Sequence, residues 1–233
     1  MKFLLATVGT ALLSVAAFGA PIALTDDFST PSNAAQANTT GNVGVNTTQN
    51  ATPIAGVSRT VFVKKTGIPA SDPFLNMNSS VGLGNFLIST DTGVDGIGGV
   101  FYSVPTTDLT GIGESFSVDW VRSDIPGGTL TFFVTSIGAP TAGNIGSMLN
   151  SGTATSTKTF VTAGTAPQTF AALLSTFSGS ADLSQITGFG FYWQTPFEQD
   201  ARFDNFHVSA PEPGTYALMG AGLAALAFLR RRK

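Results

Sequence analysis

The feature that most constrains the fold is the alternation of large apolar and small or polar side chains. In residues 188–194, for example, Phe189, Phe191 and Trp193 fall on one face. Such period-two patterning is typical of strands with one buried face. It recurs in residues 59–64, 85–90, 99–104, 115–122, 129–137, 158–162, 169–174, 188–194 and 202–208. Glycine and proline separate these segments, and helical periodicity extends no further than a turn or two. The pattern predicts an all-β fold, an antiparallel two-sheet sandwich of the jelly-roll type.

The first part of this region is less regular. Residues 24–31 read as an opening strand that Pro31 ends. Residues 32–52 are small and polar, rich in Asn, Thr, Ala and Gly, and have no apolar periodicity. We therefore expect residues 32–52 to form a long loop or a weakly ordered segment.

The N-terminal residues have the composition of a secretory signal. Lys2 precedes an apolar run with small side chains from Phe3 to Phe18, and further small residues follow. This order predicts a helical signal peptide over residues 1–20, cleaved between about Ala17 and Ala23.

Residues 211–233 contain three parts in a fixed order. Pro211, Glu212 and Pro213 come first, an uncharged apolar run over residues 216–229 follows, and Arg230, Arg231 and Arg232 come after it. Fourteen helical residues reach about 21 Å, short of a hydrocarbon core of roughly 30 Å, so flanking arginines must extend to the interface. We expect a short transmembrane helix over residues 216–229, with its basic end in the cytoplasm.

This arrangement resembles the PEP-CTERM sorting signal of Gram-negative bacteria. The resemblance is carried by Pro211, Glu212, Pro213, the apolar run and the arginines. It implies export, docking in the membrane and recognition by exosortase, with removal of the tail near Pro-Glu-Pro. It also implies an origin in bacteria that make extracellular polysaccharide and biofilm. Phe203-Asp204-Asn205-Phe206 is similar to the last strand of many such proteins. Residues 1–20, 21–210 and 211–233 would then be signal peptide, β-sandwich domain and sorting signal.

Charge and cysteine content narrow the choice of partners. Five of the 11 Lys and Arg residues, and one of the 14 Asp and Glu residues, lie in the two terminal signals, so the domain between them has a formal charge of −7. That sign disfavours nucleic acid and is compatible with cations such as calcium. The chain has no cysteine, so disulfides and thiol chemistry are excluded.

A structural calcium site is one hypothesis for the acidic residues. The terminal strands of a jelly roll commonly lie side by side, which would bring Asp26 and Asp27 to Asp204 and Asn205. Carboxylate and amide oxygens suit calcium. The alternative is that these are ordinary solvated strand-end residues.

Aromatic side chains raise the question of sugar binding. Tyr192 is expected to point outward, opposite its neighbours, and Trp193 is the second candidate platform for a sugar ring. The alternative is that both rings pack within the protein.

Catalysis has less support from the sequence. The single histidine is His207, and the chain has no nucleophile-elbow motif that would supply a serine for it to activate.

The sequence thus favours a non-catalytic protein, exported to the cell surface or secreted, with a structural or adhesive role in an exopolysaccharide or biofilm matrix. Its expected partners are exosortase, the export machinery, the membrane before processing and extracellular polysaccharide. A carbohydrate-binding module is the alternative, and a secreted glycan hydrolase is a weaker one.

Overall fold

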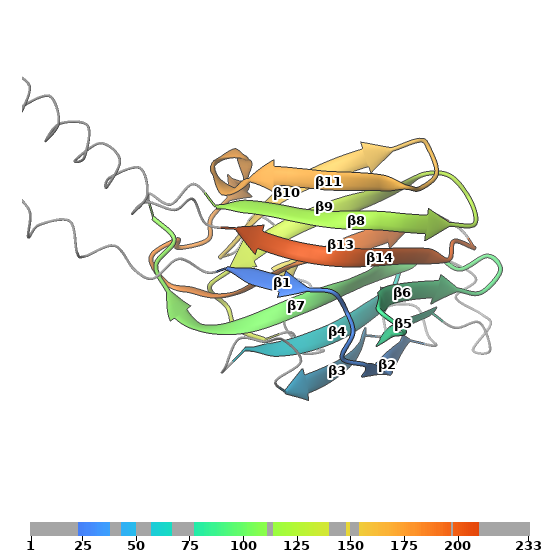
Figure 1. Cartoon of the computed structure of the whole chain (residues 1–233), viewed down its shortest axis with the longest axis horizontal. Coiled ribbons are helices and arrows are strands. Elements are labelled where there is room, and N and C mark those ends of the chain that lie inside the picture. The colour runs from blue at the N-terminus through green and yellow to red at the C-terminus, as the bar shows by residue number, and fades with distance from the viewer. Residues whose placement is uncertain are drawn as a thin grey trace, which may run out of the picture.

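The computed structural model describes residues 23–37, 43–49, 57–66, 77–110, 114–139, 148–149, 154–196 and 198–209. These residues form two antiparallel sheets packed face to face (Figure 1). Sheet A has the order β11 (Gln168–Leu173), β8 (Ser115–Ser123), β14 (Ala201–Ser209), β6 (Asn85–Thr90), β5 (Met77–Gly82) and β2 (Ser32–Ala37), with β1 (Leu24–Asp26) also paired to β14. Sheet B has the order β12 (Ser178–Gly179), β10 (Thr155–Thr162), β9 (Gly128–Thr135), β13 (Ile186–Thr195), β7 (Gly96–Thr107), β4 (Ser58–Lys65) and β3 (Val43–Gln49).

The chain crosses repeatedly between the sheets. β8 in sheet A leads to β9 and β10 in sheet B, β11 returns to sheet A, and β13 and β14 again lie in different sheets. One 3₁₀ turn, Leu174–Thr176, follows β11. The prediction of an all-β, jelly-roll-like sandwich is confirmed.

The core between the sheets is built largely from phenylalanine and tryptophan. Phe191 of sheet B lies with its ring centroid 5.3 Å from Phe206 and 5.5 Å from Phe203 of sheet A. The Trp120 and Trp193 rings are 4.8 Å apart, and both side chains are fully buried. Each aromatic ring removes a large apolar area from water, so this layer accounts for much of the stability expected of a sandwich without disulfides.

A second, smaller apolar cluster covers the outer face of sheet B. It consists of Phe62, Phe101, Phe133, Met148 and Tyr192. Gly188 on β13 makes room for it, because a Cβ there would lie 2.0 Å from Cζ of Phe101.

The prediction for residues 32–52 is wrong in part. Residues 32–37 and 43–49 form β2 and β3, which pair with β5 and β4, while residues 38–42 and 50–52 lie outside the described residues. These are outer strands, and β2 buries only the small side chains of Ala35 and Ala37, so they need no strong apolar pattern. Gly44 lets the two strands approach, because a Cβ there would lie 2.2 Å from the Gln36 carbonyl oxygen. Two other strands, β5 and β12, were also not predicted, and the opening strand is shorter than expected.

Candidate functional site

Both ends of the domain meet in one strand pair. β1 runs antiparallel to the last part of β14, with Leu24 opposite Val208 and Asp26 opposite Phe206. β1 therefore begins where β14 ends, at the left of Figure 1. The expected adjacency of the first and last strands is present, and the chain enters and leaves the sandwich at the same end.

Asp26 is not free to bind a metal ion in the way the sequence suggested. Its side chain is 3% exposed, and its Oδ2 accepts hydrogen bonds from Nη1 of the fully buried Arg59 at 2.7 Å and from the Tyr102 hydroxyl at 2.8 Å. Its Oδ1 accepts the backbone N–H of Phe28 at 2.8 Å. Burial and the Asp26 carboxylate raise the pKa of Tyr102 well above its ordinary value, which keeps the phenol protonated as a donor. Asp26 thus joins β1 to β4 and β7 across the sandwich.

The other predicted calcium ligands lie on the solvent side of sheet A. Asp204 is opposite Asp119 in the β14–β8 register, and Asn205 donates from Nδ2 to Asp119 Oδ2 at 3.0 Å. Asp27 is exposed and accepts the backbone N–H of Ser29. Partial desolvation raises the pKa of Asp204, and the negative charges of Asp119 and Asp27 add to this shift.

Calcium binding stays a prediction, and with Asp26 engaged it would depend on Asp27, Asp204 and Asn205. Among the described residues, no group of three or more His, Cys, Asp or Glu side chains is placed to hold a metal ion. The φ angle of Asn205 is +50°, which asparagine tolerates better than most residues.

The two aromatic residues proposed as sugar platforms are both buried. Trp193 is fully buried in the main core, where its Nε1 donates to Gln199 Oε1 at 2.6 Å. Tyr192 does point to the opposite face, as expected, but it is only 9% exposed because Phe133 and Met148 pack around it in the smaller cluster. The alternation along residues 188–194 correctly assigned Tyr192 and Trp193 to opposite faces of the strand. It could not show that the outer face of sheet B is also covered, because the covering residues come from other parts of the chain.

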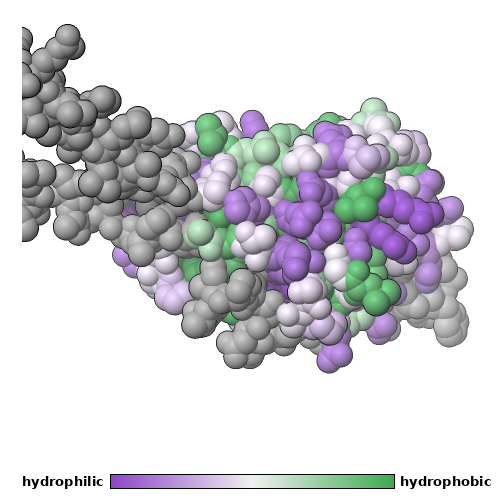
Figure 2. All heavy atoms as spheres, in the orientation of Figure 1, coloured by the Kyte–Doolittle hydropathy of each residue, from purple (hydrophilic) through white to green (hydrophobic). Residues whose placement is uncertain are grey.

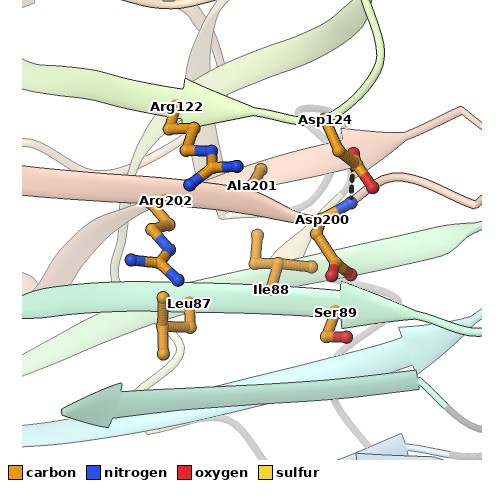
Figure 3. Close-up of a pocket in the computed structure, with 8 residues that line it drawn as sticks. All are labelled: Leu87, Ile88, Ser89, Arg122, Asp124, Asp200, Ala201 and Arg202. Carbon is orange, nitrogen blue, oxygen red and sulfur yellow. Dashed lines mark hydrogen bonds between the residues drawn. The ribbon is translucent and has the colours of Figure 1, made fainter.

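One hollow on the surface of the sandwich was not predicted from the sequence. It lies on the outer face of sheet A, has a volume of about 320 Å³, and is shown in close-up in Figure 3. Ile88 and Ala201, both almost fully buried, form its floor. Its walls are formed by Leu87, Ser89, Arg122, Asp124, Asp200 and Arg202. Figure 2 shows hydrophilic side chains gathered over this part of the sheet.

Three strands supply the hollow, so sequence spacing alone gave no signal for it. Arg202 on β14 is directly opposite Arg122 on β8. The adjacent register step pairs Phe203 with Trp120, which leaves Val121 as an extra, bulged residue on β8. Without that bulge, alternation would turn Arg122 toward the core, since Trp120 is buried.

His207 lies on the same face, near the end of β14. Its Nδ1 is 2.8 Å from the Thr25 hydroxyl, in the register that pairs these two residues across β1 and β14. This contact joins the first strand to the last. Among the residues that the structure describes, no acidic side chain hydrogen-bonds to the imidazole as it would in a catalytic base.

The predicted terminal signals lie outside the described residues. This applies to the signal peptide over residues 1–20, the Pro211-Glu212-Pro213 motif, the apolar run over residues 216–229 and Arg230, Arg231 and Arg232. Within the described part of the chain, no helix has the length and apolar character needed to cross a membrane.

Comparison with solved structures returns carbohydrate-binding modules at low similarity. The family 11 module from Clostridium thermocellum, in complex with a β-1,3-1,4-mixed-linked tetrasaccharide, is 16% identical with a TM-score of 0.35, covering 75% of this chain and 94% of its own. A family 29 carbohydrate-binding module is 10% identical with a TM-score of 0.31, covering 72% of this chain and 89% of its own. Similarity at this level assigns no ligand to the present chain. Comparison with curated proteins found no match.

A protein-family comparison gives a more specific result. Residues 209–233 match the model described as the PEP-CTERM protein-sorting motif. The match begins at Ser209, the last residue of β14, so the motif directly follows the sandwich. The chain therefore carries a PEP-CTERM sorting motif, as its sequence predicted, and this motif marks it as an exported protein that exosortase processes at the membrane.

Proposed function

We propose that this chain is a cell-surface or extracellular-matrix protein with a structural or adhesive role, delivered by exosortase. The observation that carries the proposal is the sorting motif attached without a spacer to β14. The domain has the construction such a role needs. It is a sandwich with an aromatic core and no cysteine, and it carries an excess of acidic side chains.

The geometry also separates the hollow from the point where the sorting motif joins the domain. The sorting motif follows the end of β14, where β1 begins, whereas the hollow lies at the start of β14. Eight residue steps along this strand correspond to about 26 Å. While the tail is in the membrane, the hollow would be held away from the point of attachment.

The test of this function is the fate of the tail. Mass spectrometry of the protein from the cell surface and medium should find chains that end near Pro211-Glu212-Pro213 and lack residues 216–229. Changing the three motif residues to alanine should leave the tail in place and the protein in the membrane fraction. Pro105→Ala, an exposed proline outside the motif, is the matched control and should be processed normally. An uncut chain retained in the cytoplasm would contradict the proposal.

Loss of the protein should then weaken cohesion of the matrix without changing the release of reducing sugar ends. Release of reducing ends by the purified protein would instead support the weaker alternative of a glycan hydrolase. Non-catalytic carbohydrate binding is a second candidate function, and the hollow on sheet A is the observation that favours it.

A further inference from the structure

The arginine pair in the hollow is unusual for a domain with this charge. Only six Lys and Arg residues lie between the two terminal signals, against 13 Asp and Glu residues. Arg59 and Lys65 are fully buried. The exposed arginines, Arg122 and Arg202, are nevertheless direct cross-strand neighbours. Like charges in this position destabilise a sheet, and acidic partners are in excess, so the pairing needs an explanation other than stability.

Neither arginine has a partner within the described part of the chain. In that part of the chain, no side-chain hydrogen bond or ion pair engages either guanidinium group. The ion pair that the described residues do form joins Arg59 to Asp26, outside the hollow. Figure 3 shows the two side chains leaving adjacent strands on the solvent side of the sheet. The bulge at Val121 is what brings Arg122 to this face, and bulges frequently re-aim side chains at functional sites.

The acids of the hollow are already used by the protein backbone. Asp124 Oδ1 accepts the N–H groups of Asp200 at 2.8 Å and of Ile125 at 2.9 Å. Asp200 Oδ1 accepts the Thr90 N–H at 3.3 Å. These contacts hold the acids at the far side of the hollow, where their remaining oxygens can accept hydrogen bonds from hydroxyl groups.

The lining therefore has two chemically different halves. Two guanidinium groups can bind one carboxylate through parallel, charge-assisted hydrogen bonds. Asp200 and Ser89 suit hydroxyl groups, and Leu87 gives an apolar wall beside Arg202. A ligand that combines a carboxylate, several hydroxyls and an apolar ring face is a uronic acid. A densely charged polymer such as polyphosphate or nucleic acid would be repelled by the acids of the hollow and by the formal charge of −7 on the domain between the two terminal signals.

We propose that Arg122 and Arg202 form a binding site for the carboxylate groups of an acidic, uronate-containing polysaccharide. This proposal rests on the proposed function in one respect, because such a polymer is extracellular. Sorting is measured in cells and binding on the purified protein, so either can fail without the other.

The test is calorimetric titration of the full chain, purified in mild detergent, with polygalacturonate oligosaccharides. The methyl ester of the same oligosaccharides is the matched neutral ligand. We expect binding of the acid and at least about tenfold weaker binding of the ester, because the charge-assisted hydrogen bonds are lost. R122Q/R202Q should weaken binding of the acid by a similar factor. R122K/R202K should lie between, because lysine keeps the charge but not the bidentate geometry.

Lys158→Gln is the matched control, because it removes one positive charge from sheet B, away from the hollow. It should leave the affinity within about twofold of wild type, because salt screens an exposed charge that lies away from the site. The melting temperature of R122Q/R202Q should be no lower than that of wild type, because a like-charge pair is removed. Full binding by R122Q/R202Q, equal losses in K158Q, or no binding of the acid would each overturn the proposal. So would binding of the ester, or of polyphosphate in a parallel titration, with the affinity of the acid.

Discussion

The buried pair of Asp26 and Arg59 makes the sharpest prediction about stability. Replacing Asp26 by asparagine keeps the shape of the side chain but removes the negative charge beside a guanidinium group that is fully buried. Arg59 cannot lose its proton in compensation. Its remaining contacts, the Thr30 carbonyl and the face of the Phe28 ring, carry no formal charge.

The expected magnitude follows from the burial of both groups. Breaking a buried pair from one side costs about 3–5 kcal/mol in the free energy of unfolding, because an uncompensated charge remains. Asp26 also accepts from Tyr102 and from the Phe28 N–H, and asparagine can replace these only in part, since its side chain has one oxygen. At about 2–4 °C per kcal/mol for a domain of this size, the melting temperature should fall by roughly 6–20 °C.

Urea unfolding followed by tryptophan fluorescence is the assay, because both tryptophans lie in the core. Asp27→Asn, the exposed neighbour, is the control and should change the free energy of unfolding by less than about 0.5 kcal/mol. The double variant D26N/R59M should lose clearly less free energy of unfolding than D26N and R59M lose together, because it leaves no unpaired charge in the core. A loss below about 1 kcal/mol in Asp26→Asn, or strict additivity in the double variant, would refute this reasoning.

Three further predictions concern the sheet faces. Asp204→Asn should raise the melting temperature at neutral pH by about 1–3 °C. The raised pKa of Asp204 means that its ionised form destabilises the fold, so the gain in melting temperature should disappear as the pH falls below the ordinary pKa of a carboxyl group. If calcium binds there, added calcium should raise the melting temperature of wild type and not that of Asp204→Asn. Gly188→Ala should cost about 1–3 kcal/mol in urea unfolding, whereas Gly82→Ala, whose Cβ would meet nothing within 4 Å, should not. Tyr192→Phe should leave the affinity for polygalacturonate unchanged in calorimetry, and weaker binding would restore this ring as a ligand platform.

The features that sequence predicted well are those that short stretches of chain encode. Alternation in residues 188–194 depends only on neighbouring positions, and the matched motif over residues 209–233 is contiguous. Strands β2 and β3 were missed because their stability comes from partners elsewhere in the chain and from Gly44, which lets their backbones approach. Local composition cannot report such partners.

Partners distant in the sequence also explain why the candidate binding residues were not the ones expected. Asp26 has the sequence context of an exposed acid, yet a partner 33 positions away makes it part of the core. Arg122 and Arg202 are 80 positions apart, and their meeting depends on one strand register and one bulge. A deletion of Val121 should remove that bulge and turn Arg122 toward the sheet interior, where a guanidinium group without an acid costs several kcal/mol. The deletion should therefore destabilise the fold far more than R122Q, and equal stability of the two variants would show that the bulge does not determine which way Arg122 faces.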